Sequence, residues 1–148
     1  MRQLDSSYSV YDAKGKILGR FASTVARDLI AGKRVAVINA EGAVIVGSKR
    51  VIFDKYTTRL NLQEKQNPEH SPYWSRRSDM LVKLAIRGML PKEKRTGADA
   101  YRRLMVFSGV PEQLNKVKPI EIKTKDVNTI YMPHVTIKEL SRALGYNK

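Results

Sequence analysis

The run RVAVIN at residues 34–39 constrains the fold of this chain more than any other stretch. Its apolar residues are nearly unbroken, which is typical of a strand buried on both faces of a parallel sheet. Upstream, apolar residues recur every three or four positions from Leu18 to Ile30, which predicts an amphipathic helix that Gly32 ends. Before this helix, residues 7–13 have the composition of a strand. Strand, helix and strand with short connections form a βαβ unit, so we expect an α/β fold.

Further elements are expected along the chain. A short strand at residues 43–46 is followed by a helix with Ile52, Phe53, Tyr56 and Leu60 on one face. Two more helices flank a proline-containing elbow. The first begins near Ser78, a residue type that caps helix N-termini, and stops before Pro91. The apolar residues that mark the second helix are Tyr101, Leu104 and Met105.

Residues 61–78 differ from the rest of the chain because they are polar, contain two prolines and lack periodicity. We expect a long extension there, structured mainly when something packs on it. Residues 119–148 should contain a strand at 119–123 and a short helix, with Thr136 and Glu139 as a capping box. The 148 residues should form a single domain with one core.

The charge of the chain indicates the class of partner. Lys and Arg number 28 against 14 for Asp and Glu, which gives a formal net charge of +14. A field of that sign is expected of proteins that bind polyanions. No apolar run is long enough to span a bilayer, no secretory leader is recognisable, and no cysteine is present for disulfides or thiolate zinc sites. We therefore expect a cytoplasmic protein that binds nucleic acid, with no membrane and no small-molecule substrate as partner.

The densest positive charge surrounds the elbow between the two later helices. Between Lys65 and Arg103 the sequence has ten basic and four acidic residues. A surface that only has to remain in solution does not need this concentration, whereas two helices joined by a basic elbow present cations to a phosphate backbone on a rigid frame. The RNA-binding residues expected in this region are Lys83, Arg87, Lys92, Lys94, Arg95, Arg102 and Arg103.

Aromatic and basic residues are interleaved in YWSRR at residues 73–77. An exposed Tyr73 or Trp74 could stack on an unpaired base, which is worth about 1–3 kcal/mol. The alternative for Trp74, which we favour, is that it packs the extension onto the protein's own core. For Arg76 and Arg77 we favour phosphate contacts, because adjacent uncompensated charges are rarely buried. A smaller basic patch is expected around the first turn, at Lys14, Lys16 and Arg20.

The segment GAVIVGSK at residues 42–49 nearly reproduces a phosphate-binding P-loop. Ser48 precedes Lys49, however, which reverses the order that the motif requires, and the residues between the glycines are mostly β-formers. Nucleotide hydrolysis is therefore disfavoured. Lys49 and Arg50 should lie in the first turn of a helix, where the helix dipole disfavours cations unless an anion shares the site. The residues alone support a phosphate contact and two solvated side chains about equally.

No catalytic constellation is recognisable. His70 and His134 lack metal-ligand spacing and should be surface or packing residues. The acids Asp54, Glu64, Asp79 and Asp99 form no pair of the kind that holds a metal, although acids distant in sequence could converge. We therefore expect no catalytic residue, no metal, no cofactor and no enzymatic activity.

Several motifs resemble one known family. IRGMLP at residues 86–91, followed by basic residues, Gly97 and VFSG at 106–109, closely resembles the universal large-subunit ribosomal protein thirteen family in its archaeal and eukaryotic form. Matching segments are ILGRFAS at 17–23, VAVINAEGAVIVG at 35–47 and PEH at 68–70. The C-terminus lacks the long helical tail of eukaryotic members, which favours the archaeal type. Two departures are the apolar GAVIVG and the residues Glu112-Gln113 after Pro111, where the family often has further prolines.

This resemblance implies a three-layer α/β/α core around a small, mainly parallel central sheet. It also implies a structural constituent of the large ribosomal subunit, with ribosomal RNA and neighbouring ribosomal proteins as partners. It implies no chemistry, and it implies that the protein helps to fold and brace the RNA during subunit assembly. It also favours a phosphate contact at Lys49. On the residues alone two other functions stay open. One is a free-standing basic RNA- or DNA-binding regulator, and the other is an α/β enzyme that acts on nucleic acids or nucleotides near Gly47.

Overall fold

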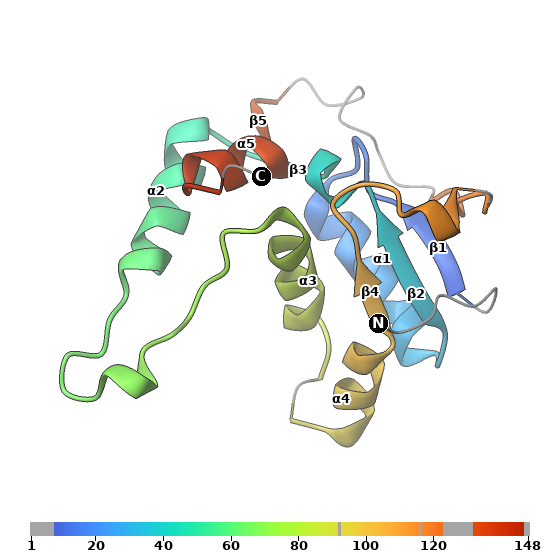
Figure 1. Ribbon diagram of the computed structural model, residues 1–148, viewed down its shortest axis with the longest axis horizontal. Coiled ribbons are helices and arrows are strands. Elements are labelled where there is room, and N and C mark those ends of the chain that lie inside the picture. Colours follow the sequence, from blue (N-terminus) through green and yellow to red (C-terminus); the bar gives the residue numbers. More distant parts are fainter. Residues whose placement is uncertain (1–7, 92, 116, 123–131, 147–148) are drawn as a thin grey trace.

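The structure, a computed structural model, describes residues 8–91, 93–115, 117–122 and 132–146. A parallel sheet with the strand order β1-β2-β4 lies at its centre (Figure 1). Its strands are β1 at Tyr8–Asp12, β2 at Arg34–Ile38 and β4 at Leu104–Val106. Val35 of β2 pairs with Ser9 on one side and with Leu104 on the other. The RVAVIN run therefore forms the buried middle strand, as its composition predicts.

Helix α1, Leu18–Ile30, connects β1 to β2 and completes the expected βαβ unit. Its buried face includes Phe21, Val25 and Leu29, which are fully covered. Gly32 follows the helix with a φ of +92°, a left-handed conformation that favours glycine. The periodicity of the sequence predicted both this helix and the residue that ends it.

The two faces of the sheet are covered differently. Val35 and Val37 belong to the main core, which joins α1 to α3 (Ser78–Gly88) and α5 (Ile137–Ala143). Ala36 and Ile38 point to the other face, where they share a smaller cluster with Val10 and Leu114. These positions follow from the alternation of side chains along a strand.

The expected α/β fold with a small parallel sheet is confirmed. On the second face, the described part of the chain covers the sheet with the 3-10 turn η3, Glu112–Leu114, where a three-layer core calls for a helix. Pro111 and Pro119 border this segment.

A second, two-stranded sheet holds the C-terminal region. Strand β3, Val44–Val46, pairs antiparallel with β5, His134–Thr136, so that Ile45 lies opposite Val135. The hydroxyl of Thr136 then accepts a hydrogen bond of 3.2 Å from the amide of Glu139 and caps α5. The predicted strand at 43–46 and the cap at Thr136 are confirmed, but the partner strand β5 was not predicted.

Helix α2, Lys49–Asn61, stands apart from the central sheet in Figure 1 and buries only Ile52. After it, residues 62–77 form a long loop, here called the arm, that returns to the start of α3 (Figure 1). The arm contains one short 3-10 turn, η2, at Pro68–His70. It therefore lacks regular structure, as its composition predicts. In the described part of the chain, no helix is both long and apolar enough to cross a membrane.

One predicted helix was drawn too long. Helix α4 spans Arg95–Arg102, and Leu104 and Met105 lie in strand β4 instead. A short apolar run fits a buried strand as well as a helix, so periodicity alone cannot separate the two. Here the pairing of Leu104 with Val35 decides for the strand.

Two smaller predictions were also wrong. Ser78 is the first residue of α3 rather than its cap, and its hydroxyl lies 3.0 Å from that of Ser108, so it is used in a tertiary contact. The strand expected at 119–123 is a single bridge between Tyr11 and Ile120, and Lys123 lies outside the described residues.

Candidate nucleic-acid interface

The elbow between α3 and α4 is a tight turn that its sequence enforces. Leu90 is buried, and the amide of Lys94 donates to the carbonyl of Pro91 at 3.2 Å. A Cβ atom on Gly97 would lie 1.9 Å from the same carbonyl oxygen. Because no side chain fits in that space, glycine is required for the first turn of α4 to approach the elbow so closely.

Three of the predicted cations surround this turn. Lys94 is exposed, and the side chains of Arg95 and Arg102 are 95% and 75% exposed. Asp99 lies 3.8 Å from Arg95 and 3.6 Å from Arg102. Ion pairs at such exposure contribute about 0–1 kcal/mol, so a phosphate can compete for both arginines at little cost. Lys92, predicted for the same surface, lies outside the described residues.

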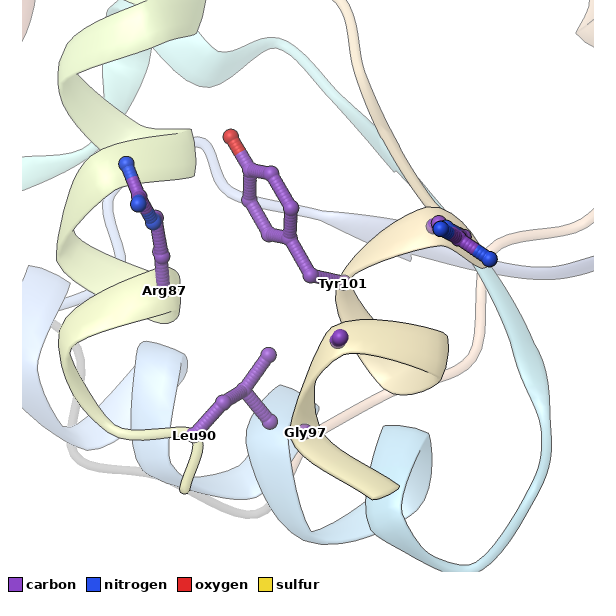
Figure 2. Close-up of a pocket in the computed structure, with 6 residues that line it drawn as sticks. Arg87, Leu90, Gly97 and Tyr101 are labelled. Atoms are coloured by element: carbon purple, nitrogen blue, oxygen red, sulfur yellow. The ribbon is translucent and has the colours of Figure 1, made fainter. Parts of the chain in front are cut away.

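Two further predicted cations lie over one aromatic ring. Lys83 and Arg87, one turn apart on α3, place Nζ and Cζ at 5.2 and 5.6 Å from the ring centre of Tyr101 on α4. Figure 2 shows Arg87 and Tyr101 facing each other across the space between the helices. Cation–π contacts of this kind hold both charges near the elbow.

Arg103 has a different environment from its neighbour Arg102. Its Nη2 donates a hydrogen bond of 2.9 Å to the carbonyl of Leu29 in the last turn of α1. Its Nε is buried and has no hydrogen-bond partner among the described residues. The same carbonyl accepts a hydrogen bond of 3.1 Å from the amide of Gly32, so Arg103 adds a second, tertiary bond to the end of α1. This bond gives Arg103 a structural role, and its contact with RNA stays a prediction.

The two arginines before α3 also differ from each other. Arg77 forms two hydrogen bonds to the carboxylate of Asp79, at 3.1 and 2.8 Å, which raise the pKa of its guanidinium. Arg76 has an exposed side chain, while its carbonyl accepts a hydrogen bond of 2.6 Å from the buried hydroxyl of Ser141. The α5 contact thus positions the backbone of Arg76 and leaves its charge at the surface.

The arm is fastened to α2 through a residue that the sequence analysis missed. The guanidinium carbon of Arg59 lies 5.0 Å from the ring of Trp74 and 5.3 Å from that of Tyr56. Trp74 is half-buried, so it packs on the protein as favoured, but against α2 and not in the main core. Tyr73 is 94% exposed. The spacing of Tyr56 and Arg59 on a helix signals their contact, whereas nothing in the sequence signals Trp74 as the third member.

The remaining predicted cations form separate groups. Lys14, Lys16 and Arg20 lie around the turn from β1 to α1. Lys49 and Arg50 begin α2, as predicted, and in Figure 1 this helix and the elbow lie well apart. The Nζ of Lys49 lies 5.5 Å from the ring of Phe53. These residues therefore do not belong to the elbow surface.

The predicted surface positions of the two histidines are confirmed, since His70 and His134 are both exposed. Within the described ranges, no three His, Asp or Glu side chains are grouped so that they could hold a metal ion. The segment of the broken P-loop contains strand β3 between Gly42 and Gly47, as its β-forming residues predict.

A comparison with known families identifies the chain. The family described as Ribosomal protein L13 matches residues 6–113, a range that includes the βαβ unit, the arm and the elbow. The chain belongs to the ribosomal protein L13 family. The resemblance of the motifs to this family is thereby confirmed.

The relatives of this L13-family protein match it over nearly its whole length. The large ribosomal subunit protein uL13 of Archaeoglobus fulgidus is 40% identical over 148 residues, covering 99% of this chain and 93% of the relative. The protein of the same name from Methanopyrus kandleri is 34% identical and covers 94% of this chain and 87% of its own. That from Sulfurisphaera tokodaii is 37% identical, with 92% and 93% covered. Such relatives agree with the archaeal type that the motifs predicted.

Proposed function

We propose that this L13-family protein is a structural constituent of the large ribosomal subunit in the cytoplasm, where it binds ribosomal RNA and has no enzymatic role. The observation that carries the proposal is the similarity to proteins named large ribosomal subunit protein uL13, which extends over 99% of this chain for the Archaeoglobus fulgidus relative. The net charge of +14 supports a polyanionic partner.

The elbow surface is the principal RNA contact in this proposal. It consists of Lys83, Arg87, Lys94, Arg95 and Arg102, and Lys92 is expected to join it. The apolar face of α3 packs on α1, so the cations are carried by a frame that is anchored in the core. Such a frame binds phosphates that RNA folding brings close together, and it recognises the shape of the RNA more than its sequence.

The other groups of cations extend the contact around the molecule. They are Lys14, Lys16 and Arg20 at the first turn, Lys49 and Arg50 at the start of α2, and Arg76 and Arg77 at the end of the arm. A protein that contacts RNA on several sides braces segments that are distant in the RNA chain. We therefore propose that it helps to hold the RNA in its folded form during subunit assembly, beside neighbouring ribosomal proteins.

Sedimentation tests the proposed function. An epitope-tagged copy of the chain, expressed in archaeal cells, should sediment with large ribosomal subunits in a sucrose gradient. RNA recovered through the tag should be large-subunit ribosomal RNA. A tagged protein that stays at the top of the gradient, or that recovers other RNAs or DNA, would instead indicate a free-standing regulator.

The salt dependence of binding tests the phosphate contacts. The affinity for large-subunit RNA should fall steeply with salt, with a logarithmic slope of about 0.7–0.9 per phosphate contact. Replacing Arg102 with alanine should reduce that slope by about 1. The matched control is Arg27→Ala, which removes an exposed arginine of α1 outside the proposed contacts and should leave the slope unchanged.

A further inference from the structure

A cavity of about 340 Å³ opens between α3 and α4, beside the elbow. Figure 2 shows it between Arg87 on one helix and Tyr101 on the other, with Leu90 at its base. Its volume is near the lower end of the range for small-ligand pockets, about 300–1,000 Å³, so it fits one small planar group and not a folded chain segment. The lining residues are Arg87, Leu90, Gly97, Ala98, Tyr101 and Arg102.

The lining combines an apolar interior with charged edges. Leu90, Gly97 and Ala98 contribute no charge, and the half-buried ring of Tyr101 forms a wall. Arg87 and Arg102 are the two charged residues of the lining. Surfaces of this composition bind molecules that have a flat apolar part and an attached anion.

The surrounding charge selects an anion. Lys83 and Arg87 lie within 5.2 and 5.6 Å of the centre of the Tyr101 ring. The acid that faces this group from α4 is Asp99, which is shared between Arg95 and Arg102 at 3.8 and 3.6 Å. Since these four cations outnumber that carboxylate, the pocket has a positive potential. An anion with an aromatic base attached could contact the cations through its charge and the Tyr101 ring through its base.

We propose that this pocket binds one unpaired nucleotide of RNA, with the base against Tyr101 and Leu90 and the phosphate at Arg87 or Arg102. The proposal rests on the proposed function and names the form of RNA that the elbow recognises. A paired base cannot enter, because its faces are stacked within the double helix. Proteins recognise single-stranded loops and bulges by such splayed bases.

The pocket has a rigid floor and a movable edge. The floor of the pocket is fixed because Gly97 lies directly against the Pro91 carbonyl, where not even a Cβ atom fits. Arg87 is exposed, so its side chain can move away from Tyr101 and return over an inserted base. Stacking between an aromatic ring and a guanidinium is a common way to hold a splayed base.

A comparison of the affinities for RNA with bases and for the same sugar-phosphate backbone without bases tests the proposal. The probes are a short, fluorescein-labelled oligoadenylate and an abasic ribose-phosphate chain of the same length, titrated with the full chain and followed by fluorescence anisotropy. The protein should bind the oligoadenylate about tenfold more tightly than the abasic chain. Equal affinities would overturn the proposal, because a site for phosphate alone does not distinguish the two probes.

Filling the pocket should abolish this preference. Ala98→Phe places a large side chain in the cavity from an exposed position of α4 and should reduce the affinity ratio to about one, while the affinity for the abasic chain changes less than about twofold. Thr96→Phe is the matched control, since Thr96 is exposed on the same helix and does not line the cavity. It should keep the tenfold ratio. Equal ratios in the two variants would contradict the proposal.

Two more variants separate the remaining explanations. Tyr101→Leu keeps an apolar wall and removes the ring. It should also reduce the ratio of the affinities for oligoadenylate and the abasic chain. This variant tests the pocket even if Ala98→Phe fails to fold. Tyr73→Leu removes the exposed ring of the arm and should leave the ratio intact. If the ratio is lost in Tyr73→Leu and kept in Tyr101→Leu, base stacking occurs on the arm and the pocket proposal is wrong.

The pocket proposal and the proposed ribosomal function can be refuted separately. A chain that sediments with large subunits but shows no preference for bases refutes only the pocket. A chain that prefers bases but stays out of large subunits refutes only the ribosomal function.

Discussion

Arg102 and Arg103 adjoin in the sequence but differ in what they contact. Arg103 bonds to the carbonyl of Leu29, a residue 74 positions away in the chain, whereas Arg102 is 75% exposed. Replacing Arg103 with alanine should lower the free energy of unfolding by about 1.5–3 kcal/mol, because it removes a hydrogen bond from a charged group to the end of α1. Arg102→Ala should change it by less than about 0.5 kcal/mol. Urea unfolding of both variants measures the difference, and equal effects would contradict these roles.

The sequence alone could not separate these two arginines. Charge density predicts that a cation lies near an RNA-binding surface, but the partner of Arg103 depends on where α1 ends relative to β4. Arg59 was missed for the same reason, since Trp74 reaches it only through the fold of the arm. Local composition therefore predicts groups of residues, while the role of each member depends on tertiary contacts.

Tyr11 and Asp28 form a polar link between β1 and α1. The hydroxyl of Tyr11 donates to Asp28 at 2.5 Å, and Lys33 donates to the same carboxylate at 3.0 Å. Burial raises the pKa of Tyr11 to about 12, and the bond to Asp28 adds to this shift. The same bond lowers the pKa of Asp28, with a further contribution from Lys33.

The raised pKa of Tyr11 predicts how stability depends on pH. Tyr11→Phe should lower the free energy of unfolding by about 1.5–3 kcal/mol near neutral pH, because it removes a hydrogen bond to a charged group. The folded state holds the tyrosine proton more tightly than the unfolded state, so this advantage is complete below pH 10 and disappears as pH rises toward 12. Urea titrations of the parent and the variant from pH 8 to 12 should therefore converge. A difference in the free energy of unfolding that stays constant across that range would show that the ionisation of Tyr11 does not affect stability.

At the scale of elements, glycine at position 97 determines how α4 meets the elbow. Gly97→Ala should lower the melting temperature clearly, because the new Cβ would lie 1.9 Å from the Pro91 carbonyl and the elbow would have to open. Gly88→Ala is the matched control, since no atom lies within 4 Å of a Cβ at that position in α3. Alanine in a helix is favoured over glycine by about 0.5–1 kcal/mol, so the control should be neutral or slightly stabilising. Calorimetry measures both, and a neutral Gly97→Ala would mean that the elbow is not rigid.

The arm depends on one stacked arginine for its attachment to α2. Arg59→Ala should expose Trp74, because the guanidinium lies 5.0 Å from the centre of its ring and covers one face. Since Trp74 is the single tryptophan, its emission should shift to longer wavelength and become easier to quench with acrylamide. Arg50→Ala, which removes a 92% exposed arginine of the same helix, should leave the emission unchanged. Unchanged emission in Arg59→Ala would mean that other contacts hold the arm.

Elements that depend on local pattern were predicted well, and those that depend on distant partners were not. The periodic residues of α1 and the cap at Thr136 carry their own signals, and both were predicted. Strand β4 was taken for the end of a helix, and β5 was missed, because each has three residues and exists only through its pairing. Short strands lack the length over which a period of two can be recognised.

At the scale of the whole molecule, the core and the charged surface are two sides of the same elements. Leu81, Val82 and Ile86 place one face of α3 in the main core, and Lys83 and Arg87 lie toward α4 and Tyr101. Binding can therefore use rigid cations at low entropic cost, since the core already holds the helix in position. The sequence predicted where the cations concentrate. It could not predict the cavity between α3 and α4, which depends on the angle at which these helices meet.

Electron cryomicroscopy of large ribosomal subunits purified through a tag on this chain tests the central claim most directly, namely that the elbow cations hold ribosomal RNA. The measured quantity is the distance from the side-chain nitrogens of Lys94, Arg95 and Arg102 to the nearest RNA phosphate oxygens. We expect most of these distances to be about 3–4 Å, the range of charge-assisted hydrogen bonds and ion pairs. A map in which the three side chains extend into solvent, with RNA bound elsewhere on the protein, would contradict the account.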